Sequence, residues 1–133
     1  MASILKVDDL RGNTSAGNIT ITSEGGAATM QLQQGIAKAW FRTFFSSGTP
    51  TSRDSFNIAS YVDVGTGKVE PTFTNVMGND DYVCAGNCHS GNDVNILIGN
   101  EASILTTKFL WNNYDNGTFT DTALGGIVAG DLA

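Results

Sequence analysis

The sequence is poor in charged residues, in cysteine and in proline. Charged residues make up 15% of its 133 residues, and 7 Lys and Arg stand against 13 Asp and Glu, so the net charge is −6. With so few cations and no basic stripe, we expect no binding to the phosphate backbone of nucleic acid or to an anionic membrane surface. Two cysteines allow one intramolecular disulfide at most, which is too few for a disulfide framework.

Long apolar runs are also missing. No stretch approaches the roughly 18 apolar residues that a membrane-spanning helix needs. The first nine residues lack the long apolar centre of a secretory signal. We therefore expect synthesis in a cytosol without membrane insertion. One His and two Cys cannot supply the roughly four ligands of a zinc site within one chain, and no cofactor is expected.

Glycine and hydrophobic residues are plentiful, with 16 Gly and 41% hydrophobic residues. Short apolar or alternating runs recur at intervals of about 8–12 residues, which is typical of an antiparallel sandwich or barrel. The fold class predicted for residues 41–133 is therefore all-β, an antiparallel, jelly-roll-like β-sandwich. We expect its strands at 40–45, 53–64, 69–74, 82–84, 94–98, 103–111, 118–120 and 127–129.

Two turns and one proline add detail to this prediction. Gly65-Thr66-Gly67 predicts a tight reversal, because Gly adopts positive φ without steric cost. Asp115-Asn116-Gly117 is the strongest hairpin signal in the chain. Pro71 cannot donate a ladder hydrogen bond, so its strand should be an edge strand or carry a bulge.

Residues 1–40 have a different character. Residues 18–22 alternate apolar and polar side chains as a half-buried strand does. Leu32, Ile36 and Ala39 fall at i, i+4 and i+7, which predicts one face of a short helix that Gly35 keeps brief.

Such a segment has too little apolar surface to fold alone. We therefore predict that residues 1–40 are an N-terminal docking and trimerisation segment. The expected trimer interface consists of Leu32, Ile36, Ala39 and Trp40. The alternative is a helix that lies on its own domain.

The run Cys84-Ala85-Gly86-Asn87-Cys88-His89 is the most prominent candidate for chemistry. It has one residue too many between the cysteines for haem attachment. A Gly-Asn turn would bring Cys84 and Cys88 within bonding range, so we expect either an optional disulfide or two free thiols. His89 is the only candidate general base, and three copies of it at a trimer axis could bind zinc.

No catalytic arrangement emerges from the remaining sequence. His89 has no triad spacing around it and a nucleophile elbow is absent, so we expect no enzymatic activity. Residues 79–81 and 91–95 are rich in side-chain oxygen and fit either calcium binding or, more commonly, Asx turns. Trp111, Tyr114 and Phe119 flank the predicted hairpin, where they would either contact a glycan or fill the sandwich core.

Several segments resemble one known family. Residues 32–40 (LQQGIAKAW) resemble the LQQGLAKAW stretch of virion fibre-like and decoration proteins from marine and freshwater bacteriophages. Residues 53–60 are similar to the RDSFNVSS that follows it there, and residues 62–67 to a segment that ends in GTG. The chain departs from the family pattern at residues 40–45, where WVNFNG is usual, and at the Cys84–Cys88 segment.

The resemblance implies a non-enzymatic homotrimer on the surface of a phage particle, made in the cytoplasm of the host bacterium. It would be a capsid decoration (cement) protein or head fibre that stabilises the virion and displays an outward β-domain. Its partners would be other virion proteins, either the major capsid protein or a tail adaptor. The alternative is a tail fibre that recognises host cell-surface glycans.

Overall fold

The computed structural model describes residues 5–13, 19–22, 26, 28–89, 95–99, 103–115 and 117–132, the side chains of 33, 34, 89 and 95–99 excepted. The chain forms two compact units, Met1–Ile36 and Ala37–Ala133. The division falls after Ile36, earlier than the boundary expected after Trp40, because the first strand of the second unit already begins at Ala39.

The N-terminal unit is built around a two-stranded hairpin. Strand β1 (Thr20–Thr22) pairs antiparallel with β2 (Thr29–Gln31), and a strand was predicted over 18–22. Helix α1 (Leu32–Gly35) follows at once. The expected helical face is wrong beyond this point, because Ile36 has extended backbone angles and Ala39 belongs to a strand.

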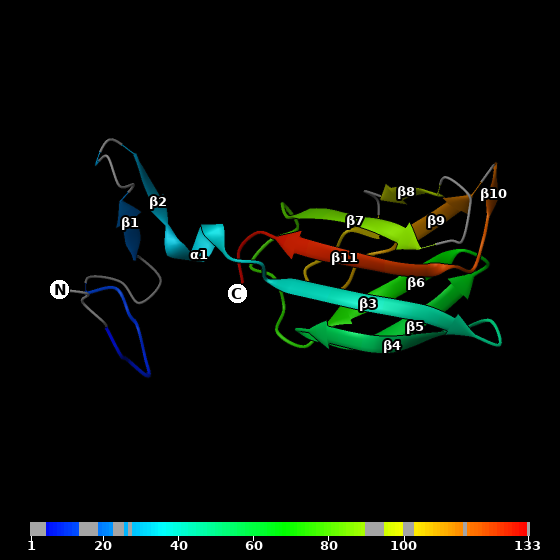
Figure 1. Cartoon of the computed structure of the whole chain (residues 1–133), viewed down its shortest axis with the longest axis horizontal. Helices are drawn as coiled ribbons and strands as arrows, with labels where there is room; N and C mark the ends of the chain where they lie inside the picture. Colours follow the sequence, from blue (N-terminus) through cyan, green and yellow to red (C-terminus); the bar gives the residue numbers. More distant parts are fainter. Residues whose placement is uncertain are drawn as a thin grey trace. The chain divides into compact units, whose positions relative to one another are not determined.

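The second unit is a sandwich of antiparallel strands, as predicted (Figure 1). One sheet has the strand order β4-β3-β11-β7, and the other has the order β10-β9-β6-β5 with β8 also paired to β9. The strands are β3 (Ala39–Ser46), β4 (Thr49–Phe56), β5 (Ile58–Gly65), β6 (Lys68–Phe73), β7 (Val83–His89), β8 (Asn95–Gly99), β9 (Trp111–Asp115), β10 (Thr118–Phe119) and β11 (Ala123–Ala129).

The hydrophobic core lies between these two sheets. Phe109 is at its centre, with its ring centroid 5.3 Å from that of Phe73, 5.7 Å from Trp111 and 6.0 Å from Phe41. Among the residues that the structure describes, the buried core residues all belong to the second unit, which therefore has an interior of its own. They are Ala39, Phe41, Val69, Phe73, Met77, Tyr82, Phe109, Trp111, Leu124 and Val128.

Glycines at the two predicted reversals have the backbone angles that these turns need. Gly65 (φ +132°) and Gly67 (φ +67°) join β5 to β6, and Gly117 (φ +91°) lies between β9 and β10. Both predicted turns are therefore confirmed. The single strand expected over 53–64 is wrong, because Asn57 adopts φ +58° and separates β4 from β5.

Two other strand predictions need correction. Strand β7 runs on to His89, where a loop was expected after Cys84. The strand expected over 103–111 is instead a turn, with Leu105 and Lys108 bridged, before β9 begins.

For the strand that contains Pro71, the sequence left an edge strand or a bulge open. Strand β6 is not an edge strand, since it lies between β5 and β9, but the register of its ladder with β5 shifts at two places. Its ladder with β9 includes only Lys68 and Val69, so no hydrogen bond from the nitrogen of Pro71 to β9 is needed.

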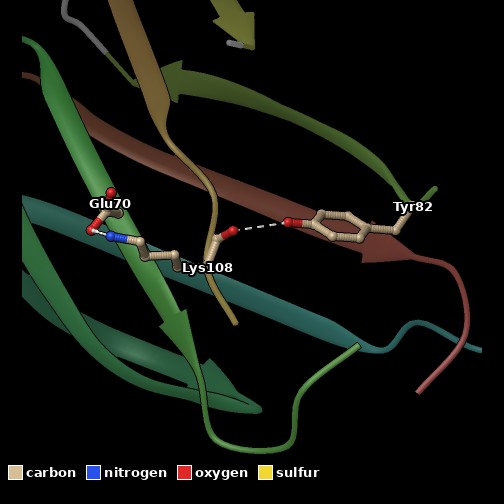
Figure 2. A network of polar contacts seen from close by, with 3 residues as sticks. All are labelled: Glu70, Tyr82 and Lys108. Carbon is tan, nitrogen blue, oxygen red and sulfur yellow. Dashed lines mark hydrogen bonds and ion pairs between the residues drawn. The ribbon is translucent and has the colours of Figure 1, made fainter. Parts of the chain in front are cut away.

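Polar contacts hold the 105–108 turn in place (Figure 2). The Tyr82 hydroxyl donates to the carbonyls of Leu105 at 2.9 Å and Lys108 at 3.1 Å. The Lys108 ammonium lies 2.9 Å from the Glu70 carboxylate on β6. Since these contacts fix both ends of the turn, Phe109 is held in the core directly after it.

Candidate interaction surface

The residues predicted for a trimer interface lie in different environments. Leu32 is half-buried in α1 and Ile36 is exposed, both in the N-terminal unit. Ala39 is completely buried among the core residues of its own sandwich, so it cannot contact another chain. The prediction that it belongs to the trimer interface is therefore wrong. Trp40 follows it on β3 and is 39% exposed.

Trp40 lies in a row of apolar side chains that crosses the whole four-stranded sheet. The register pairs Phe56 with Trp40, Trp40 with Ile127, and Ile127 with Ala85. Residues directly opposite each other on neighbouring strands point to the same side of a sheet. Phe41, one residue after Trp40, is in the core, so this row is on the outer face. We call Phe56, Trp40, Ile127 and Ala85 the apolar row.

The apolar row is accessible. Phe56 is 51% exposed and Ile127 48% exposed, and the nearby Val83 on β7 is 68% exposed. The next outward pair on one side is Arg42 opposite Asp54. An apolar strip with charged residues at its border is typical of a protein interaction surface.

The residues predicted to contact a glycan do not form one exposed aromatic face. Trp111 is only 3% exposed and belongs to the core, so the expectation that it fills the sandwich core is confirmed and the alternative, that it contacts a glycan, is wrong. The rings of Tyr114 and Phe119 meet edge to face, with centroids 5.1 Å apart. The Lys68 ammonium lies 4.6 Å from the centre of the Phe119 ring. Phe119 is therefore the exposed member of the three, with one ring face near a cation.

The two cysteines are not bonded to each other. Both are free thiols on the continuous strand β7. Four residues along a strand span about 13 Å, whereas a disulfide needs Cα atoms within about 7 Å. The predicted disulfide is therefore wrong, and two free thiols are confirmed. The cause is the pairing of β7 with β11 along its full length, which removes the expected turn.

Both thiols face the interior, and neither is activated. Burial raises the pKa of Cys84 to about 12. Burial and the nearby Asp115 carboxylate raise the pKa of Cys88 as well. A thiol needs a lowered pKa to act as a nucleophile near neutral pH, so these side chains are structural. The side chain of His89 lies outside the described part of the structure. Its predicted role as a base or zinc ligand therefore also falls outside that part.

A buried asparagine was not identified from the sequence. Asn113 on β9 has no exposed surface; its side-chain oxygen accepts from the Cys88 thiol at 2.8 Å. Its amide nitrogen donates to the Thr120 carbonyl at 2.8 Å and to the Thr122 hydroxyl. Its backbone N–H donates to the Gly67 carbonyl at 2.6 Å. This one residue therefore ties together β7, β9, the β5–β6 turn and the segment before β11.

The oxygen-rich loop at 79–81 has the geometry of an Asx turn, since the Asp81 N–H donates to the Asn79 side chain at 3.0 Å. Residues 91–94, in the other candidate calcium loop, lie outside the described residues. Within the part of the chain that the structure describes, no three His, Cys, Asp or Glu residues gather in a metal-binding arrangement. Among those same residues, no helix has the length and apolarity to cross a membrane.

No family model matches the chain, and neither a curated protein nor a solved structure matches it.

Proposed function

We propose that this chain is a non-enzymatic structural protein of a bacteriophage particle. It forms a homotrimeric surface appendage, a capsid decoration protein or head fibre, which stabilises the virion and displays the sandwich outward. The likeness of residues 32–40 and 53–60 to virion fibre-like proteins supports this proposal. The apolar row supports self-association independently of that likeness.

The observation that carries the proposal is the exposure of the apolar row. Complete burial of a side chain such as Trp40, Phe56 or Ile127 contributes about 1.5–3 kcal/mol, an upper estimate for side chains that are already partly covered. A second copy of the chain presents the same apolar residues. Contacts between copies would therefore remove them from water on both partners.

The N-terminal unit adds further uncovered apolar surface. Its described large apolar side chains are exposed except for Ile19 and Leu32, which are half-buried, and none belongs to the buried core. A two-stranded hairpin is at best marginally stable by itself in water. In the proposed assembly this unit contacts its sister copies and a virion protein, either the major capsid protein or a tail adaptor. The exposed residues are Leu5, Val7, Leu10, Ile21, Met30 and Ile36.

Imaging tests the location directly. Particles of a phage that encodes this chain would be purified, treated with a gold-labelled antibody against the sandwich, and viewed by electron microscopy. The proposal predicts label on the head, with none on particles from a phage in which the gene is deleted. Absence of the chain from purified particles contradicts the virion assignment itself.

A tail fibre that binds host glycans is the second candidate, and the exposed Phe119 ring favours it. Label confined to the tail would select this candidate over capsid decoration. Glycan binding by the whole chain would then fall on Phe119→Ala and persist in Phe56→Ala, since Phe56 lies on the other sheet. Equal glycan binding by Phe119→Ala and the parent chain contradicts the role of this ring.

A further inference from the structure

The outer face of the four-stranded sheet has two halves of different shape. Beside the apolar row runs a second row of outward residues, two positions away along each strand. From β4 to β7 this second row consists of Asp54, Arg42, Gly125 and Asn87. On β4 and β3 the two rows therefore carry two aromatic and two charged side chains, whereas on β11 and β7 they include a glycine and the small Ala85.

An open hollow of about 280 Å³ lies over the half of the face that has the small residues. A Cβ added at Gly125 would lie 3.3 Å from the Phe41 carbonyl oxygen and 3.8 Å from Oδ1 of Asn87. The hollow is present because residue 125 has no side chain, and we call it the glycine hollow. Its outward lining residues are Arg42, Ala85, Asn87, Gly125 and Ile127.

Exposed aromatic rings lie on the other half of the same face. Phe56 on β4 is 51% exposed, and Trp40 beside it on β3 is 39% exposed. An apolar cavity of about 150 Å³ holds a benzene molecule, so the glycine hollow has room for a phenyl ring. Aromatic side chains that fill pockets on a partner are the usual centres of protein interfaces. The face thus has both an aromatic anchor and a hollow of matching size.

The charges beside these two features are complementary. Asp54 lies two residues from Phe56 on the same face of β4, about 7 Å along the strand. Arg42 borders the glycine hollow. A Phe56 ring seated in the glycine hollow of a second copy would therefore carry a carboxylate into reach of the long Arg42 side chain of that copy. Contacts between a carboxylate and a guanidinium favour this docking and set its orientation.

We propose that Phe56 of one copy docks in the glycine hollow of the next copy, and that three copies close into a ring in this way. The inference rests on the proposed homotrimer and adds how its copies meet. Because the aromatic rings and the hollow lie on different halves of one face, each copy contacts one neighbour through its rings and the other through its hollow. Such head-to-tail contacts form a ring when their rotation closes.

Crosslinking of the full chain tests which strands meet. In the double variant Asp54→Cys/Asn87→Cys, the new thiols lie on the two edge strands of the sheet, about 14 Å apart in their own chain, too far for a short bismaleimide. Burial raises the pKa of the native Cys84 thiol to about 12 and raises that of Cys88, so neither competes. The proposal predicts covalent trimers on a denaturing gel, and none from either single variant. Covalent dimers as the end product, or no bridging, overturn it.

Filling the glycine hollow tests the docking without a crosslinker. Gly125→Val should weaken assembly by about tenfold, which corresponds to about 1.4 kcal/mol. Gly78→Val is the matched control, because a Cβ there would also lie 3.3 Å from a carbonyl oxygen, that of Leu132, and Gly78 does not line the hollow. Sedimentation velocity compares the variants once circular dichroism has shown that they are folded. Equal assembly of Gly125→Val, Gly78→Val and the parent chain overturns the proposal.

Light scattering of the parent chain separates the failure of this docking from the failure of the proposed homotrimer. If the parent chain is a trimer and the variants do not behave as described, the docking alone is overturned. If the folded parent chain is a monomer, the homotrimer is contradicted together with the docking.

Discussion

Similar apolar side chains are buried in the sandwich and exposed in the N-terminal unit. In the sandwich, Phe41 and Phe73 on different sheets pack around Phe109, so their apolar surface is removed from water. In the N-terminal unit, Ile21 and Met30 are directly paired across β1 and β2 and yet both are exposed. The difference is a second layer. Strand pairing alone does not bury a side chain, whereas a facing sheet does.

The same contrast occurs within a single strand of the sandwich. Phe41 is 2% exposed and belongs to the core, whereas its neighbour Trp40 is on the outer face of the same sheet. The inner face has its facing sheet in the same chain. The outer face, like the N-terminal hairpin, has apolar residues for which we propose a partner in another copy.

The largest expected effect is in the core. Phe109→Ala removes the ring in contact with four other aromatic rings and should lower the free energy of unfolding by about 3–5 kcal/mol. Phe119→Ala is the matched control, since its ring is exposed, and should cost about 1 kcal/mol or less. Urea unfolding followed by circular dichroism measures both. Equal losses would contradict the assignment of the core.

The buried asparagine should have the next largest effect. Asn113→Leu keeps a similar volume but leaves the Thr120 carbonyl and the Cys88 thiol without this partner, at a cost of about 1–3 kcal/mol. Asn112→Leu is the control, because the buried Oδ1 of Asn112 has no hydrogen-bond partner to lose. The same urea titration compares them. A loss as large for Asn112→Leu would show that side-chain shape, not the polar network, is what matters.

A smaller effect is expected on association. Ile127→Ser removes an apolar side chain from the apolar row and should weaken assembly by about tenfold, or about 1.4 kcal/mol. Val62→Ser changes a side chain of similar exposure on β5 in the other sheet and should leave assembly unchanged. Sedimentation velocity over a dilution series gives the constants. Identical behaviour of the two variants would remove the apolar row from the interface.

The smallest effect concerns alkaline pH. The pKa of Cys84 rises to about 12 on folding, because the folded chain keeps this thiol from water. As pH rises, the unfolded chain therefore loses the thiol proton before the folded chain does. The stability that the buried, neutral thiol contributes below about pH 9 is lost between about pH 9 and pH 12. Burial also raises the pKa of Tyr82 and of Cys88, and these shifts act in the same direction.

Urea midpoints at about pH 8 and about pH 10.5 test this linkage. The midpoint should fall at the higher pH, and it should fall less in Cys84→Ala, in which one of the three titrating groups is gone. A midpoint that rises with pH would contradict the buried position of these groups.

Local sequence signals predicted those parts of the fold that depend on local conformation. The two reversals, at Gly65–Gly67 and before Thr118, need positive φ at Gly65, Gly67 and Gly117. Glycine adopts positive φ readily, so its presence in the sequence predicts these turns. The extent of β7 was not predicted, because residues 85–89 look like a turn. Their strand conformation comes from pairing with β11, some forty residues away in sequence. Such long-range pairing overrides local propensity.

The candidate surface was predictable only in part. Trp40 was selected from the sequence as an interface residue, but as the end of a helix rather than as part of a sheet. Its neighbours Phe56, Ile127 and Ala85 come from three other strands and meet it only through register. A shift of one residue would turn each of them to the core face, so no single segment could reveal the apolar row.

Light scattering of the purified full chain tests the central claim most directly, namely that other copies cover the apolar surface which this chain leaves exposed. The account predicts a mass of about three times 14.0 kDa at micromolar concentration. A mass of about 14.0 kDa under the same conditions, with the chain folded, would contradict it.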